Sequence, residues 1–202
     1  MLAFGDAGFY GSMAGKALNA PTVGIKPTRS GKGYWLVGAD GGVFALGDAG
    51  FYGSMAGKAL NAPVVGIALT TTGKGYWLVG ADGGVFAFGD AAFHGSEAGR
   101  ALNAPVVGIK RTNGGTGYWL VGADGGVYGF GDAAFYGSMG GKALAKPVVG
   151  MTSTPGGKGY WLAGADGGIF PFGDAGLAGS EAGKTLNAPV VGIASAADSG
   201  IG

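Results

Sequence analysis

The sequence contains no cysteine, so disulfide bonds and thiolate metal sites are excluded. It also lacks an apolar run long enough for a membrane helix, and it lacks the basic start and apolar core of a signal peptide. Only 12% of its 202 residues are charged and the net charge is +1, which is too sparse and too balanced for an electrostatic nucleic-acid surface. We therefore expect neither nucleic-acid binding nor insertion into a membrane.

Sequence patterns of catalysis are missing as well. Neither a Gly-x-Ser-x-Gly nucleophile turn nor a Gly-x-x-x-x-Gly-Lys-Ser/Thr phosphate loop occurs. The chain has one histidine, His94, with no second histidine or cysteine to complete a metal site or a triad. We expect no enzymatic activity, no cofactor and no metal, and a hydrolase remains the weakest of the alternatives.

What the sequence has in abundance is repetition. Gly-Tyr-Trp-Leu occurs four times at a step of 42 residues, with tryptophans at Trp35, Trp77, Trp119 and Trp161. A Gly-Asp-Ala phrase keeps the same step, with aspartates at Asp6, Asp48, Asp90, Asp132 and Asp174. A fixed period of this size indicates a repeat architecture, in which each unit buries its apolar face against its neighbours.

Each repeat is predicted to hold four short strands and no helix. In the repeat at 43–84 the strand-like runs are 43–46, 50–55, 63–69 and 75–79, rich in aromatic and β-branched residues and bounded by glycine. Asp40-Gly41-Gly42 separates two apolar runs and predicts a tight hairpin.

The strands carry apolar residues on both faces, with Tyr34 and Leu36 on one and Trp35 and Val37 on the other. A sheet buried on both sides fits blades that pack face to face, so we predict an all-β fold, a five-bladed β-propeller. Four complete four-stranded blades are expected at 21–62, 63–104, 105–146 and 147–188. A fifth would join 189–202 with 1–20, within one 202-residue domain, and would lack its Gly-Tyr-Trp-Leu strand.

The repeat also carries a family resemblance. Asn61-Ala-Pro-Val-Val-Gly-Ile-Ala68, then Gly75-Tyr-Trp-Leu-Val, then Ala81-Asp-Gly-Gly-Val-Phe resembles a propeller blade of the NHL type. It is also similar to tandem repeats of secreted and cell-wall-associated actinobacterial proteins, where they flank hydrolase domains. The resemblance covers the whole chain and implies a propeller in a bacterial, secreted or cell-surface parent protein. The sequence starts and stops in mid-repeat, so we expect a piece of a longer array.

Three sets of side chains recur once per repeat and are candidates for ligand binding. A cation and a hairpin aspartate are expected on the same face of the disk, where they either pair across blades or bind an anionic or sugar ligand. A tyrosine on the outer run is the third candidate, with His94 in its place in one copy. The cations are Lys16, Lys58, Arg100, Lys142 and Lys184, the aspartates Asp40, Asp82, Asp124 and Asp166, and the tyrosines Tyr10, Tyr52 and Tyr136.

The other recurrent residues have structural interpretations. The five Gly-Asp-Ala aspartates are read as turn residues that bond the amides just ahead of them, with a cation-binding ring as the alternative. The tryptophans are expected in the core between blades rather than stacked on sugars. Near-identical repeats create equivalent sites, which favours a non-catalytic module for binding or spacing, with a glycan or a protein as the possible ligand.

The alternative is a multivalent lectin with one weak sugar site per blade. The incomplete fifth blade should also leave an open strand edge near Val190-Val191 and Leu2–Phe4, through which the chain associates with itself.

Overall fold

The computed structural model describes residues 3–195 and is all-β, with no helix in that range. Its twelve strands are β1 (Thr22–Pro27), β2 (Gly33–Gly38), β3 (Val43–Gly47), β4 (Val64–Leu69), β5 (Gly75–Gly80), β6 (Val85–Gly89), β7 (Val106–Arg111), β8 (Gly117–Gly122), β9 (Val127–Gly131), β10 (Val148–Ser153), β11 (Gly159–Gly164) and β12 (Ile169–Gly173). They form four antiparallel sheets of three strands each, with consecutive strands as neighbours.

The hairpin that the sequence predicts at Asp40-Gly41-Gly42 is confirmed between β2 and β3. Gly41 has a φ of 73°, which favours glycine, and the Gly38 amide donates to the Gly42 carbonyl at 2.8 Å. The Asp40 Oδ1 atom accepts a hydrogen bond from the Gly42 amide at 3.0 Å. This turn fixes the register in which Trp35 lies opposite Ala45.

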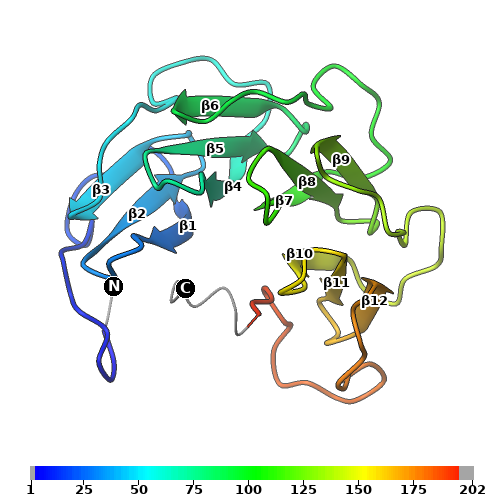
Figure 1. Ribbon diagram of the computed structural model, residues 1–202. Helices are drawn as coiled ribbons and strands as arrows, with labels where there is room; N and C mark the ends of the chain where they lie inside the picture. Colours follow the sequence, from blue (N-terminus) through cyan, green and yellow to red (C-terminus); the bar gives the residue numbers. More distant parts are fainter. Residues whose placement is uncertain (1–2, 196–202) are drawn as a thin grey trace.

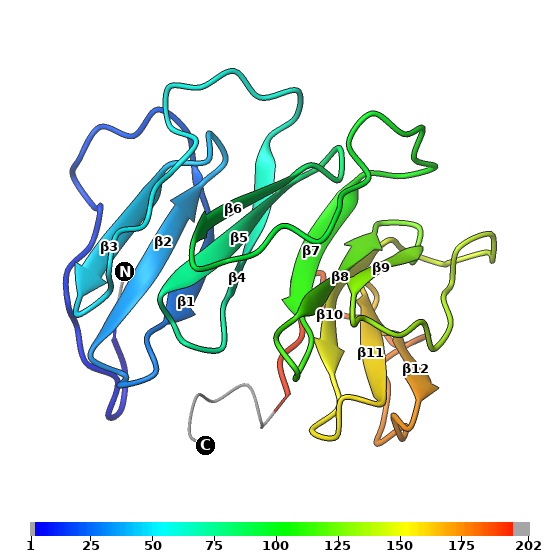
Figure 2. The same ribbon diagram turned by 45° about the horizontal axis from the view of Figure 1, so that its top comes forward.

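The four sheets follow one another in an arc that resembles the blades of a propeller (Figure 1). The first strands, β1, β4, β7 and β10, lie innermost and contact each other in sequence, while the third strands lie outermost. The sheet β1–β3 and the sheet β10–β12 stand at the two ends of this arc (Figure 1). In Figure 2 the long connections run outside the sheets that they join.

The core lies between neighbouring sheets, as the two-sided apolar strands predict. At the first junction Trp35 and Val37 of one sheet pack with Tyr76 and Leu78 of the next, and the two following junctions repeat this arrangement. Every residue of β2, β5 and β8 is buried. Burial of the aromatic and aliphatic side chains between sheets is therefore the main source of stability.

The prediction of a fourth strand at 50–55 is wrong. Gly53 has a φ of 134°, outside the range of a strand, and the segment crosses to the next sheet instead of extending its own. The Tyr76 hydroxyl of that next sheet donates to the Gly53 carbonyl at 2.6 Å and accepts from the Tyr52 amide at 3.2 Å. The polar backbone groups that a fourth strand would have paired are satisfied by a side chain.

The fifth sheet, expected from the two ends of the chain, is not among the sheets of residues 3–195. Neither 3–20 nor 189–195 contains a strand, and Leu2, part of one expected closing edge, lies outside the described residues, as do residues 196–202. The run after β12 nevertheless begins like the three runs before it, at β4, β7 and β10. The Val190 amide donates to the Ala165 carbonyl at 3.0 Å, as the Val64 amide does to the Ala39 carbonyl at 2.9 Å.

Candidate functional site

Three of the four tryptophans are buried away from any surface site. Trp35, Trp77 and Trp119 are only 1–2% exposed, which confirms their prediction as core residues, whereas Trp161 on the end sheet is half-buried. Each indole N–H donates to a backbone carbonyl of the segment outside its sheet, for example Trp77 Nε1 to the Ala92 oxygen at 2.7 Å. A ring buried on both faces has no surface on which a sugar can stack.

The outer tyrosines are also less available than the sequence suggested. Tyr10, Tyr52 and Tyr136 are half-buried, because each ring packs against the tyrosine of the following sheet at 5.6–6.1 Å between centroids. The Tyr136 hydroxyl donates to the Gly157 carbonyl at 3.0 Å. His94 takes the same place and packs against the Tyr118 ring at 5.8 Å.

The exposed side chains of this segment lie one position earlier in each repeat; they are four phenylalanines and one leucine, which the sequence analysis missed. They are about 60% exposed in every copy: Phe9 58%, Phe51 61%, Phe93 59%, Phe135 63% and Leu177 59%. The signal for finding them was the alternation of side chains along an extended backbone, which places neighbours on opposite faces.

Four of the five Gly-Asp-Ala aspartates, Asp48, Asp90, Asp132 and Asp174, connect two loops of one sheet. The Asp132 carboxylate accepts hydrogen bonds from the hydroxyls of Thr112 at 2.7 Å and Thr116 at 2.8 Å, and Asp48 accepts from Thr28 at 2.8 Å and from Ser30. The hydroxyl of Ser30, followed by that of Thr28, holds the pKa of Asp48 below its ordinary value. Their partners are side-chain hydroxyls, not the backbone amides expected.

The hairpin aspartates act as turn residues in all four copies. Each accepts a hydrogen bond at 2.9–3.0 Å from the amide of the glycine two residues later. Only one carboxylate oxygen is used in this way at Asp40, so its Oδ2 atom has no hydrogen bond within residues 3–195. The Asp40 side chain is half-buried and can accept further hydrogen bonds from a ligand.

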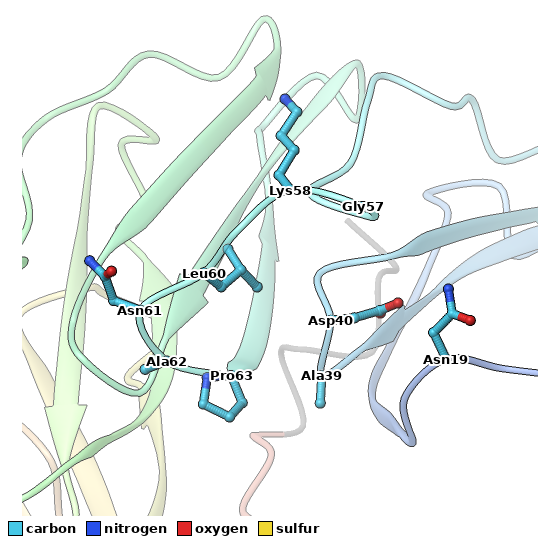
Figure 3. Close-up of a pocket in the computed structure, with 9 residues that line it drawn as sticks. All are labelled: Asn19, Ala39, Asp40, Gly57, Lys58, Leu60, Asn61, Ala62 and Pro63. Carbon is cyan, nitrogen blue, oxygen red and sulfur yellow. The ribbon is translucent and has the colours of Figure 1, made fainter.

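The structure brings two of the candidate sets together at one pocket. A hollow of about 490 Å³ lies where the first two sheets meet, with Asp40 and Asn19 on one side and the segment 57–63 on the other (Figure 3). Lys58 and Asn61 supply polar groups from that segment, and Leu60 and Pro63 supply apolar surface. The two asparagines were missed because an Asn-Ala-Pro phrase reads as a loop.

Four polar side chains at this pocket are free to bind. Within residues 3–195, the side chains of Asn19, Asn61 and Lys58 form no hydrogen bond or ion pair, and Asp40 keeps one free oxygen. Lys58 extends away from Asp40 in Figure 3, so the expected pairing of these two residues does not occur. The arrangement offers a carboxylate, two carboxamides and an ammonium group beside an apolar surface.

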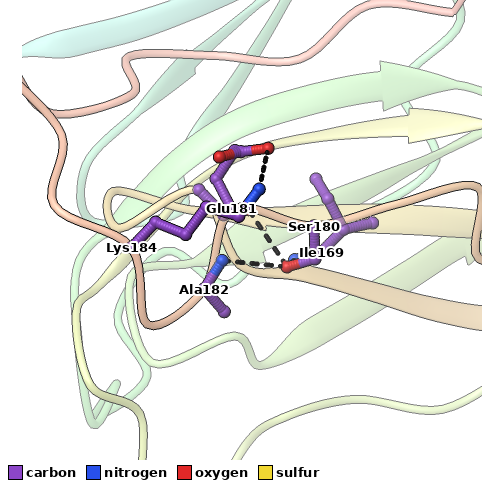
Figure 4. Close-up of polar contacts among 6 residues, drawn as sticks. Ile169, Ser180, Glu181, Ala182 and Lys184 are labelled. Atoms are coloured by element: carbon purple, nitrogen blue, oxygen red, sulfur yellow. Dashed lines mark hydrogen bonds and ion pairs between the residues drawn. The ribbon is translucent and has the colours of Figure 1, made fainter.

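The recurrent cations differ in their partners, which the sequence analysis did not notice. Arg100 forms an ion pair at 3.3 Å with Glu97, and Lys184 forms one at 2.9 Å with Glu181 (Figure 4). The residue three positions before Lys58 is Met55, and Met139 stands in the same place before Lys142. Lys58 and Lys142 therefore keep an unpaired positive charge within the described part of the chain.

No cluster of three or more histidine, cysteine, aspartate or glutamate side chains able to hold a metal occurs within the described residues. No helix in residues 3–195 has the length and apolar character needed to cross a membrane. No family model matches the chain, and no curated protein matches it significantly.

Proposed function

We propose that the chain is a non-catalytic binding module of the β-propeller class, with a fifth blade that combines its two ends. Its ligand is a hydroxyl-rich molecule, a glycan, that carries a carboxylate. The observation behind this proposal is the pocket of Asn19, Asp40, Lys58 and Asn61. Within residues 3–195 three of these side chains have no hydrogen-bond or ion-pair partner, and Asp40 keeps one free carboxylate oxygen. The repeat's likeness to secreted and cell-surface arrays supports an extracellular setting.

Each side chain has a role that follows from its chemistry. The free Oδ2 atom of Asp40 accepts a hydrogen bond from a hydroxyl, and the Asn19 and Asn61 carboxamides both donate and accept. Leu60 and Pro63 contact the apolar face of a sugar ring. These are groups that bind polyhydroxylated ligands, and none of them is arranged as an activated nucleophile with its base.

The repeat that binds the carboxylate of the ligand is the one whose recurrent cation has no ion-pair partner. At Lys58 the ammonium is unpaired and can bind a ligand carboxylate, whereas Glu97 and Glu181 already neutralise Arg100 and Lys184. At Lys142 the position of Asn61 is taken by Ala145, so that copy lacks one carboxamide. The pocket with Lys58 is therefore the strongest site, and the other copies contribute avidity.

The test uses oligomers of a hexuronic acid and the same oligomers with their carboxyl groups reduced to alcohols. We expect calorimetry to show binding that weakens about tenfold or more in Lys58→Ala, because a hydrogen bond to a charged group contributes about 1.5–3 kcal/mol. Met55→Glu should have the same effect by giving Lys58 the partner that Arg100 already has in Glu97. Lys184→Ala is the matched control and should bind like the unmodified protein.

Three results would contradict the proposal. Equal binding of the acidic and the reduced oligomers would show that Lys58 does not bind a carboxylate. The protein would then be a lectin that binds neutral sugars. No binding on a glycan array at high protein density would favour a spacer, and hydrolysis of any glycan or ester in the panel would favour the hydrolase alternative.

A further inference from the structure

The loop between β7 and β8 holds the single Asn-Gly pair of the sequence, Asn113-Gly114. The other four asparagines all stand before alanine. In any chain the side-chain amide of an asparagine can be attacked by the backbone nitrogen of the next residue, and glycine, which has no Cβ, hinders this attack least. Whether the pair reacts in the folded protein depends on what surrounds it.

The nitrogen that would react is not held by the fold. Asn113 and Gly114 are both exposed and lie outside the strands. The Gly114 amide forms no hydrogen bond within residues 3–195, whereas the amide of Gly115 donates to the Thr112 carbonyl at 3.1 Å. The Gly114 nitrogen is therefore open to attack the side chain before it.

Glycine is required at this place because of Asp132. In the first two sheets the equivalent residues, Ser30 and Thr72, donate their hydroxyls to the aspartate of the same sheet. A Cβ atom at Gly114 would lie 2.5 Å from the Asp132 Oδ2 atom, so a side chain would not fit there without movement. Thr116 supplies the hydroxyl instead, at 2.8 Å from the same oxygen. The third sheet therefore keeps its aspartate bonded and acquires an Asn-Gly pair.

The side chain of Asn113 connects the third sheet to the fourth. Its Nδ2 atom donates to the Pro155 carbonyl at 2.7 Å and lies 3.5 Å from the Thr154 carbonyl oxygen. The same side chain packs against Gly157, where a Cβ atom would lie 3.2 Å from Asn113 Cγ. The contact between the two loops therefore depends on the amide hydrogens of Asn113.

We propose that Asn113 is a site of spontaneous deamidation, and that the reaction breaks this contact between the third and fourth sheets. The Gly114 nitrogen loses its proton and bonds to Asn113 Cγ, while the bond from Cγ to Nδ2 breaks and ammonia leaves with that proton. Water then opens the cyclic imide at one of its two carbonyl carbons. Opening at Cγ gives aspartate, and opening at the backbone carbonyl carbon gives isoaspartate. Water is the only co-reactant.

Either product removes the hydrogen bond to the next loop. A carboxylate has no hydrogen to donate, and at this place it faces the carbonyl oxygens of Pro155 and Thr154. Isoaspartate also lengthens the backbone of the loop. The β7–β8 loop and the hairpin at Asp124 lie at opposite ends of β8, so the reaction is separate from the hairpin side of the sheets, where Asp40 borders its pocket.

The experiment follows the folded, unmodified protein during incubation between pH 6 and 9. Trypsin releases residues 112–142 as one peptide, in which Asn113 is the only asparagine, and mass spectrometry measures its conversion to the acid. We expect Asn113 to react about tenfold or more faster than Asn61 or Asn103, which precede alanine. The rate should rise about tenfold per pH unit, because the attacking nitrogen must lose its proton. Methylation by an isoaspartate-specific methyltransferase should label the same peptide.

Three variants test the structural consequence. Asn113→Asp carries one product from the start and should melt about 2–4 °C below the unmodified protein, the shift expected for one lost hydrogen bond in a domain of this size. The incubated protein should approach the same melting temperature. Asn113→Gln, which would have to form a larger ring, should stay unmodified during incubation. Asn103→Asp adds the same charge at an exposed asparagine with no hydrogen bond within residues 3–195, and it should melt like the unmodified protein.

Three results would overturn the proposal. The first is conversion of Asn61 or Asn103 as fast as that of Asn113. The second is an Asn113 that reacts in urea but not in the folded protein, because the loop would then block the attack. The third is an unchanged melting temperature in both the incubated protein and Asn113→Asp, because the bond to Pro155 would then not hold the two loops together.

Discussion

The sheets at the two ends of the arc differ from the two sheets between them, although all four have almost the same sequence. Ile67, on the interior strand β4, is 3% exposed, whereas Ile25, its counterpart on β1, is 50% exposed. At the other end the side chain of Glu181 is 54% exposed, against 7% for Glu97 in the interior. Position in the array, not residue type, decides how much a side chain is buried.

The difference between the end sheets and the interior sheets shows where the stability of the repeat comes from. A sheet of three strands buries little by itself, and the core clusters all lie at junctions between two sheets. An end sheet shares one junction and an interior sheet shares two. Substitutions at equivalent positions should therefore cost more in the interior, and this difference can be measured.

The largest difference is expected at the tryptophans. Trp77→Ala should lower the free energy of unfolding by about 3–5 kcal/mol, the usual cost of removing a large buried aromatic side chain. Trp161→Ala should cost about 1–2 kcal/mol, because Trp161 lies on the end sheet and is half-buried. Both indoles donate a hydrogen bond at 2.7 Å, so the comparison isolates burial. Urea unfolding measures the free energy of unfolding of both variants. Equal losses of free energy would show that the face of the end sheet is covered in solution.

The isoleucines sharpen the comparison at the other end. Ile67→Ala should cost about 2–4 kcal/mol, because Ile67 is buried against the first sheet. Ile25→Ala should cost less than about 1 kcal/mol, because half of its surface is already in water. Thermal unfolding of the two variants at one protein concentration checks this. A large loss in Ile25→Ala would mean that another surface covers β1 in solution.

Much of the fold could be predicted from the repeat itself. The three regular strands of each copy, the hairpin at Asp40 and the two-sided burial of Trp35 and Tyr34 follow from alternation and from glycine placement. The fourth strand was predicted wrongly because strand propensity at 50–55 ignored the positive φ of Gly53 and the competing hydroxyl of Tyr76. A hydrogen bond from a side chain to the backbone, such as that of the Tyr76 hydroxyl, does not change the pattern of apolar residues, so this pattern could not predict it.

The candidate site was predicted only in part. The sequence placed Asp40 and Lys58 on one face of the molecule, and the pocket brings them together with Asn19 and Asn61. It did not reveal that their charges would stay unpaired, because that depends on whether a methionine or a glutamate stands three residues before the cation. Met55 and Glu97 occupy equivalent places, and only the contacts with Lys58 and Arg100 show what the difference does.

The smallest expected difference concerns acid stability, at Asp132 in the interior and Asp6 near the start of the chain. Burial raises the pKa of Asp132, but hydrogen bonds from Thr112 and Thr116 outweigh it and leave the pKa below its ordinary value. A carboxyl whose pKa is lowered by folding stabilises the folded state above its unfolded pKa, about 3.9, and loses that effect as the pH falls through the folded pKa. Asp6 has no such hydroxyl partner within residues 3–195.

Asp132→Asn should therefore lower the free energy of unfolding at pH 7 by a few tenths to about 1 kcal/mol, a small amount because water screens this exposed carboxylate. The difference from the unmodified protein should shrink steadily below pH 4, since protonation removes the charge that the two hydroxyls stabilise. Asp6→Asn, the matched control, should leave the whole profile unchanged. Urea unfolding between pH 2 and 7 measures all three proteins. A difference for Asp132→Asn that stays constant with pH would show that the bonds to Thr112 and Thr116 stabilise the protein without depending on charge.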